Sequence, residues 1–199
     1  INSTIREYIC SIMSKIEVNT IDAVSGTSTL TLGSSNASTI ALGSGDVQSN
    51  FLQPSFFVRL SSDQTISSGT ETKVAFNTEV FDSDNAFDNS SNYRFTVPSG
   101  KAGKYIFNWT VDVFNSNNAI KNFNSFLKKN GTTFFESTWN TNNNSITSRR
   151  FSSSFSVCDD LSASDYIELF FSAGTSDSSS SSIKGTNYNT SFGGFRIGT

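Results

Sequence analysis

Residues 17–50 contain too few large apolar side chains to form a core of their own, and this shortage constrains the fold more than any other feature. Within this segment the phrase LTLGS (30–34) returns as IALGS (40–44). Each copy predicts a short strand followed by a Gly-Ser turn. Because such strands bury apolar side chains only against further copies, we expect an intertwined β-stalk of three chains. Four residues of this stalk are expected at the shared axis: Leu30, Leu32, Ile40 and Leu42. The alternative is a disordered linker, which is the usual state of Ser/Gly-rich segments.

Residues 1–16 carry the pattern of a short amphipathic helix. Isoleucines recur at spacings of four, three and four, as in the seam of a coiled coil, at Ile5, Ile9, Ile12 and Ile16. Isoleucine at both seam positions favours three or four strands over two. The pattern predicts a trimeric coiled-coil seam. A helix packed on its own domain is the alternative, because two heptads are few.

The composition excludes several classes of function. Charged residues make up 16% of the chain and the net charge is −3, so the sequence offers no basic footprint for nucleic acid. The absence of histidine removes the commonest general base and zinc ligand. No apolar run approaches the length of about 18 residues that a membrane span requires. We therefore expect no enzyme, no cofactor, no nucleic-acid partner and no membrane insertion.

Two acidic clusters remain as candidates for chemistry. The stretch DSDN (82–85) has the oxygen spacing of a Ca²⁺ loop but lacks the Gly and the distant Glu of an EF-hand. Asp159 and Asp160 are candidates for a glycosidase carboxylate pair. In both cases the favoured interpretation is a solvated turn or edge charge. Cys10 and Cys158 are expected to be reduced thiols.

Residues 51–199 predict an all-β domain. Short runs rich in Phe, Val, Tyr and Thr are separated by Gly, Asn, Ser and Asp clusters, as in a sandwich or barrel. Apolar residues at every second position from 105 to 113 predict a strand with one buried face. The run 166–171 is apolar on both faces, which suits a strand pressed onto a neighbouring subunit. The Ser-rich segment 174–187 predicts a mobile surface loop.

Several of these runs together resemble the globular heads of the C1q/TNF family. KVAFN (73–77) and NYRFTVPSGKAGKYIFNWTV (92–111) are similar to the family's early strand, its Phe-Thr-x-Pro strand end and its Gly-x-Tyr-x-Phe strand. Later segments resemble the family's hairpin and closing strands: FLKKNG (126–131), DYIELFF (165–171) and FGGFRI (192–197). The departures are a longer turn at 99–102, Ser164 in place of a Gly, and the lack of a preceding collagen tract.

This resemblance implies a jelly-roll sandwich that assembles as a threefold-symmetric trimer. In the family, the sheet that contains the last strand lines the threefold axis. The resemblance therefore implies interface positions at Phe107, Phe170 and Phe195. The stalk phrases are similar to stem repeats in fibre and spike proteins of phages and large DNA viruses.

Trp139 lies in an Asn-rich stretch, ESTWNTNNNS (136–145). An exposed indole ring stacks on a sugar face while amides bind its hydroxyls, which predicts a ligand site at Trp139, Asn140 and Asn142. The favoured interpretation, however, is a core Trp at a strand end. Acceptor patterns for N-glycosylation, such as NWT (108–110), matter only if the chain passes through a secretory pathway.

The sequence thus predicts the distal part of a homotrimeric virion fibre or spike, with three parts: a helical seam (1–16), a β-stalk (17–50) and a head (51–199). The head is expected to bind a host-surface glycan or protein, and the protein is expected at the virion surface. The first alternative is a secreted C1q/TNF-like ligand of a cellular organism. A polysaccharide-degrading tail spike is the least favoured reading.

Overall fold

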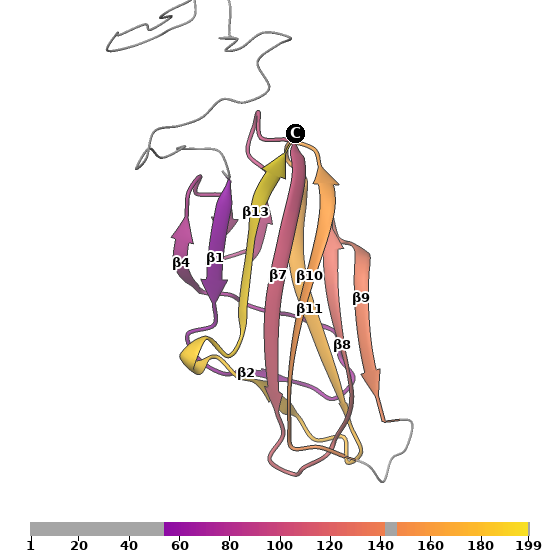
Figure 1. Cartoon of the computed structure of the whole chain (residues 1–199). Coiled ribbons are helices and arrows are strands. Elements are labelled where there is room, and N and C mark those ends of the chain that lie inside the picture. Colours follow the sequence, from indigo (N-terminus) through magenta and orange to yellow (C-terminus); the bar gives the residue numbers. More distant parts are fainter. Residues whose placement is uncertain (1–53, 142–146, 199) are drawn as a thin grey trace, which may run out of the picture. The chain divides into compact units, whose positions relative to one another are not determined.

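The computed structural model describes residues 54–141 and 147–198 (Figure 1). These residues all lie in one compact unit, Ser49–Thr199. The predictions for the seam and the stalk fall outside the described residues, and so does Asn142. The eight interface positions of the seam and the stalk are therefore still predictions: Ile5, Ile9, Ile12, Ile16, Leu30, Leu32, Ile40 and Leu42.

The first layer is a seven-stranded sheet in the order β2-β12-β7-β13-β1-β4, with β10 paired to the other edge of β7. Its strands are β1 (Ser55–Arg59), β2 (Gln64–Ile66), β4 (Thr78–Asp82), β7 (Gly103–Phe114), β10 (Arg150–Leu161), β12 (Ser181–Ile183) and β13 (Ser191–Gly198).

The second layer is a six-stranded sheet in the order β5-β6-β11-β8-β9, with β3 also paired to β11. Its strands are β3 (Thr72–Lys73), β5 (Phe87–Asp88), β6 (Arg94–Thr96), β8 (Ile120–Lys129), β9 (Thr132–Asn140) and β11 (Tyr166–Thr175). A short 3₁₀ turn, η1 (Thr186–Tyr188), precedes β13. The described part of the chain is therefore all-β, as predicted, and none of its helices is long and apolar enough to cross a membrane.

Alternating side chains bury one face of the central strand β7. The predicted inward positions, from Tyr105 to Val113, are all buried, whereas Lys104 and Asn108 are exposed. Strand β10 pairs with β7 along its whole length, with Phe155 opposite Trp109. The period of two in the sequence thus predicted both the strand and its buried face.

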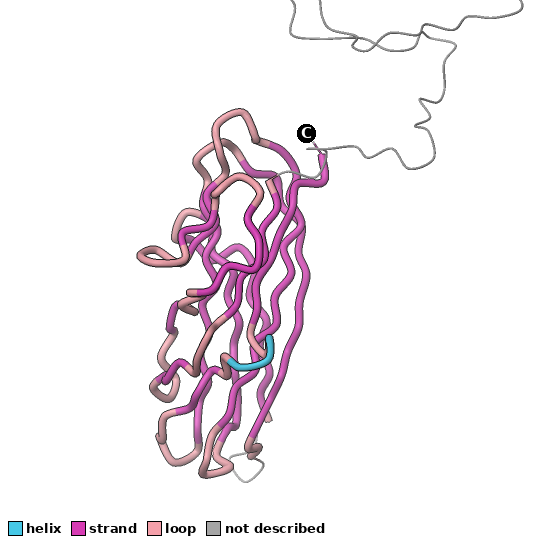
Figure 2. The backbone as a smooth tube through the Cα atoms, turned by 90° about the vertical axis from the view of Figure 1, so that its left-hand side faces the viewer, coloured by secondary structure: helices cyan, strands magenta, loops and turns pink. Residues whose placement is uncertain are grey.

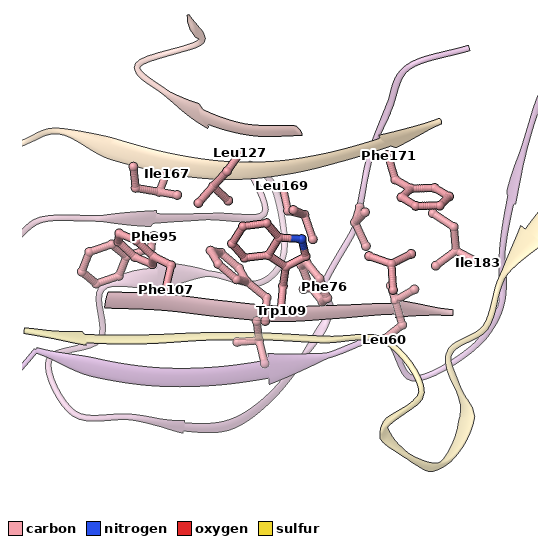
Figure 3. Close-up of a cluster of buried hydrophobic side chains, with 14 of the residues drawn as sticks. Leu60, Phe76, Phe95, Phe107, Trp109, Leu127, Ile167, Leu169, Phe171 and Ile183 are labelled. Atoms are coloured by element: carbon pink, nitrogen blue, oxygen red, sulfur yellow. The ribbon is translucent and has the colours of Figure 1, made fainter. Parts of the chain in front are cut away.

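The core lies between the two sheets and is rich in Phe. Phe56 stacks on Phe95 at 4.8 Å between ring centroids and meets the edge of Phe192 at 5.1 Å. Each Phe of this kind contributes about 1.5–3 kcal/mol when fully buried. Figure 3 shows side chains of both sheets meeting between the layers, among them Phe107, Trp109, Leu127, Ile167 and Leu169. The buried Trp109 Nε1 donates a hydrogen bond to Ser125 Oγ at 2.7 Å, so its one polar atom is satisfied.

The strands run along the length of the head, and its loops lie at both ends and along one long side (Figure 2). Strand β1 begins beside the end of β13, because Ser55 pairs with Phe195. We call this the entry end, and we call the opposite end, where β7 finishes at Phe114, the far end.

The prediction of a surface loop at 174–187 was wrong at both ends of that segment, whereas residues 176–180 between them form a turn. Residues 174–175 complete β11, and the Ser-rich run contains the paired strand β12. Ile183 of that strand is fully buried and pairs with Val113 of β7. A single apolar residue thus draws the segment into the sheet, although serines surround it.

Candidate functional site

The outer face of the seven-stranded sheet carries an apolar patch at the entry end. Phe57, Phe81 and Phe195 form this patch. They line a hollow of about 330 Å³, and Phe57 and Phe81 stack at 6.4 Å between ring centroids. Among the described residues, the exposed large hydrophobic side chains are Val80 (45%), Phe81 (51%) and Ile197 (44%). All three lie on β4 or β13, the strands on either side of β1.

Two adjacent glycines of β13 shape this patch. A Cβ on Gly193 would lie 2.7 Å from Cδ2 of Phe57, so the missing side chain leaves room for that ring on the outer face. A Cβ on Gly194 would lie 2.6 Å from Cδ1 of Phe107, on the core side of the same strand. The GG pair therefore allows aromatic rings to pack closely against both faces of β13.

The middle of the outer face is polar. Asn108 of β7 is exposed beside the patch and contributes to its hollow. Thr110 Oγ1 and Ser154 Oγ share a hydrogen bond at 2.7 Å across β7 and β10. Cys158, an exposed thiol of β10, lies toward the entry end of the same strand.

The far end of the outer face is ionic. Arg150 Nε donates to both carboxylate oxygens of Asp112, at 2.9 and 3.1 Å, and this contact raises the pKa of Arg150. Lys184 forms an ion pair with Asp63, and its hydrogen bond lowers the pKa of that carboxyl. These cations are thus paired within the chain.

A second aromatic surface lies on the side of the sandwich where β9 and β10 face each other. We call Phe135, Trp139, Phe151 and Phe155 the aromatic flank; all four rings are half-buried. Trp139 and Phe151 are 4.0 Å apart between ring centroids, and Phe135 and Phe155 are 5.9 Å apart. Strands β9 and β10 are both edge strands, with no described strand paired to their outer sides. The flank therefore combines half-buried rings with unpaired strand edges.

The three head positions predicted for an interface fall in three different places. Phe195 lies in the apolar patch. Phe107 is fully buried in the core of its own chain, so its side chain has no surface to offer a partner. Phe170 belongs to β11 of the six-stranded sheet, not to the sheet that contains the last strand. The interface roles expected for Phe107 and Phe170 therefore do not fit their positions.

The outward side of β11 is covered by lysines of the same chain. Lys128 Nζ lies 4.3 Å and Lys73 Nζ 5.5 Å from the centroid of the Phe170 ring. Lys73 also pairs with Glu168, and Lys128 with Glu71. Lysine stems thus shield the outward ring, which accounts for the two apolar faces of the 166–171 run without a neighbouring subunit.

Trp139 packs against the core. Its ring stacks on Phe123 at 5.7 Å with an interplanar angle of 15°, and Phe151 lies at 4.0 Å. This placement favours the core interpretation over a sugar platform. Asn140, at the end of β9, is exposed.

The acidic candidates serve local structure. Asp82 accepts hydrogen bonds from the backbone N–H groups of Asp84 (3.2 Å) and Phe87 (2.7 Å). Asp88 accepts from Ser90, Ser91 and Asn92, and these bonds lower its pKa strongly. Both carboxylates therefore shape the loop that contains them.

Asp159 and Asp160 do not form a carboxylate pair. They are adjacent residues of β10, so their side chains leave opposite faces of the sheet. Lys129 donates a hydrogen bond to Asp159 at 3.0 Å. The geometry gives these two residues no common substrate position.

Sequence reasoning missed Phe57 and Phe81 of the patch. The signal was present in SFFVR (55–59), where Phe56 and Phe57 must face opposite sides of one strand. One of the two rings therefore had to lie outside the core.

No protein-family model matches the chain, and no curated protein does. Solved structures do match the fold. The globular domain of zebrafish complement 1qA is similar at a TM-score of 0.51 and 16% identity, over 73% of this chain and 98% of that one. Eiger TNF from S. frugiperda gives 0.51 and 9% over 72% and 91%, and murine APRIL gives 0.51 and 13% over 72% and 99%. The head of this protein is therefore a jelly roll of the C1q/TNF type.

Proposed function

We propose that this chain forms the head of a homotrimeric binding protein whose subunits meet at the outer face of the seven-stranded sheet. The apolar patch carries the proposal. Phe81 is 51% exposed there and surrounds a hollow together with Phe57 and Phe195, while Val80 and Ile197 are exposed on the same two strands, β4 and β13. Clustered exposure of this kind marks an interaction surface on a soluble protein.

The position of the aromatic flank supports a ring rather than a twofold pair. The patch lies over β4, β1 and β13, and the flank lies at the β10 side of the same sheet. Two different apolar surfaces on one chain favour a head-to-tail contact, in which the flank of one copy packs on the patch of the next. Such contacts close into a ring when the rotation between copies permits it.

Two features of the sequence support three copies. The isoleucine seam at 1–16 favours three or four strands, and the C1q/TNF resemblance implies three. Native mass spectrometry of the 199-residue chain tests the assembly, and we expect a species of three chains. A single chain or a twofold pair as the main species would contradict the proposal.

We propose further that the trimer is the distal part of a virion fibre or spike and binds a host-surface glycan or protein. The β-stalk phrases support this assignment, because they resemble fibre stems. Three linked heads would raise avidity by 10²–10⁴ over one head if the sites on the target lie within reach. No catalytic step is assigned to the chain.

The second candidate is a secreted ligand of a cellular organism. The similar solved structures include a complement domain and a TNF protein, which favours this alternative. The acceptor pattern that begins at Asn108 speaks against it, because this exposed residue lies beside the apolar patch. A glycan there would occupy the surface that we assign to assembly.

A further inference from the structure

A second hollow lies outside the apolar patch, between two loops at the entry end. Its volume is about 510 Å³, and it is lined by the loop 84–90 and by Thr96, Val97 and Pro98. It shares no lining residue with the hollow of the patch. Two features of the sequence meet here: the loop that begins with DSDN, and the end of β6 before the lengthened turn 99–102. The volume lies within the range of small-molecule sites in proteins, roughly 300–1,000 Å³.

Internal hydrogen bonds hold this loop in shape. Asp82 binds the N–H groups of Asp84 and Phe87. Asp88 binds Ser90 through both the backbone (3.0 Å) and the side chain (3.2 Å). Thr96 N donates to the carbonyl oxygen of Ala86 at 2.8 Å, which ties the loop to β6. Because the loop is already ordered, a ligand need not order it on binding.

Neutral polar groups line the hollow without protein partners. Asn85, Asn89 and Thr96 are among its lining residues, and none of their side chains makes a hydrogen bond with a described residue. Each amide offers both donors and an acceptor. Groups of this type match the hydroxyls of a sugar, which also donate and accept.

The charges of the hollow nearly cancel. Asp84 Oδ1 lies 3.8 Å from Lys101 Nζ, and the other oxygen of Asp84 accepts from Ser83 at 2.7 Å. The carboxylate of Asp88 is occupied by its own loop. Few carboxylate oxygens are left for a divalent cation, and no cationic group stands unopposed for an anion. Ala86 and Pro98 add half-buried apolar surface of the kind that packs on the C–H face of a pyranose ring.

We propose that this hollow binds one neutral saccharide unit, held by Asn85, Asn89 and Thr96. This inference deepens the proposed binding function and rests on it only for the multiplication of sites in a trimer. The hollow itself is complete within one chain. Its lining is separate from the patch, so sugar binding and assembly can be tested independently.

The test uses the full chain made in a bacterial host without N-glycosylation, since NSS (89–91) is also an acceptor pattern. Binding is measured on an array of neutral glycans and by saturation-transfer NMR with the sugars retained. The variant Asn85→Gly/Asn89→Ala removes both amides. Glycine suits position 85 because Asn85 has a φ of +52°. Asn118→Gly is the matched control, because Asn118 has a φ of +56° and lies in a far-end loop.

We expect the chain to retain a neutral glycan, the double variant to bind it at least about tenfold more weakly, and the control to bind as the parent does. Thr96→Val should weaken binding to a smaller degree. Unchanged binding by the double variant would overturn the site, and so would an array on which the parent chain retains no neutral glycan. Loss of binding on addition of EDTA would also overturn it, since a cation would then hold the sugar. Light scattering of each variant reports assembly separately, so failure of the sugar site is distinguishable from failure of the trimer.

Discussion

The two sheets of the head treat their outward-facing aromatic residues differently. On the six-stranded sheet, Phe170 lies beneath Lys73 and Lys128 of the same chain. On the seven-stranded sheet, Phe81 is 51% exposed and belongs to a patch with other apolar residues. Both rings point away from the core, yet no charged group of Lys or Arg lies over the Phe81 ring among the described residues.

One sheet therefore has an outer face that its own chain covers, and the other has an outer face with exposed apolar side chains. Lysine stems cover apolar surface while keeping their ammonium groups in water, so a sheet shielded in this way needs no further partner. An exposed ring beside other apolar side chains still gains from burial in a second chain. The contrast therefore points to the seven-stranded sheet, and not to the six-stranded one, as the assembly surface.

The largest expected effect is that of a glycan on Asn108. In a host with a secretory pathway, chains glycosylated at this position should remain monomeric, because the glycan would stand beside the patch. Intact-mass analysis of the monomer and trimer fractions from size-exclusion chromatography measures this. The variant Asn108→Gln keeps the other acceptor patterns and should restore the trimer. Trimers that carry a glycan at Asn108 would contradict the assembly face.

The next effect is that of a charge in the patch. Phe81→Asp should weaken assembly by about 30-fold or more, since removal of a central interface side chain costs about 2 kcal/mol or more. The monomer should stay folded, because Phe81 is half exposed. Light scattering over a dilution series measures the change. Phe170→Ser is the matched control on the other sheet and should leave the assembly unchanged. If only the Phe170→Ser control dissociated, the six-stranded sheet and not the seven-stranded one would form the assembly surface.

The glycine pair of β13 allows the core side and the outer side of one strand to be compared. Gly194→Ala places a methyl group against Phe107 inside the core and should lower the free energy of unfolding by about 1–3 kcal/mol. Gly193→Ala presses on Phe57 at the surface, where the ring is half-buried and able to shift. It should therefore affect assembly more than monomer stability. Denaturant unfolding and light scattering of both variants separate these effects. Equal losses of stability would indicate that the patch is as rigid as the core.

The smallest expected effect is a loss of stability at low pH, when Asp177 becomes protonated. Hydrogen bonds from Ser179 and Asn117 lower the pKa of Asp177, in the far-end loops, from 3.8 to about 2. A lowered pKa in the folded state stabilises the protein above the unfolded value of 3.8, and this contribution is lost as the pH falls toward 2. The difference in melting temperature between the parent and Asp177→Asn should therefore be constant above about pH 4 and shrink below it. If the difference in melting temperature between the parent and Asp177→Asn did not change with pH, the ionised Asp177 would not contribute to stability.

The alternation of apolar and polar residues in the sequence was enough to predict the core strands and the all-β fold class. The alternation in β7 also places Phe107 on the same side as the buried Trp109, so its side chain lies in the core. Alternation does not predict how Phe170 is covered. Its cover comes from Lys73, which is distant in the sequence and adjacent only through the pairing of β3 with β11.

The candidate sites depended still more on tertiary structure. The hollow at the entry end joins the loop 84–90 to the end of β6 through the hairpin of β5 and β6, but its volume and its lining follow only from the packing. Trp139 has polar neighbours in the chain, but its spatial neighbours are Phe123 and Phe151. Local composition thus indicated a strand at Trp139, whereas the role of its ring depends on the residues that it packs against.

Hydroxyl-radical footprinting of the 199-residue chain tests the central claim most directly, with Phe81 as the reporter. Oxidation of Phe81 is compared between the parent chain and a Phe195→Asp variant at the same concentration, and Phe170 is followed in both as an internal reference. We predict that Phe81 is protected in the parent, becomes oxidised in the variant as the chains separate, and that Phe170 reacts equally in both. Rapid oxidation of Phe81 in the parent chain, at the rate found in the variant, would show that no second chain covers this face.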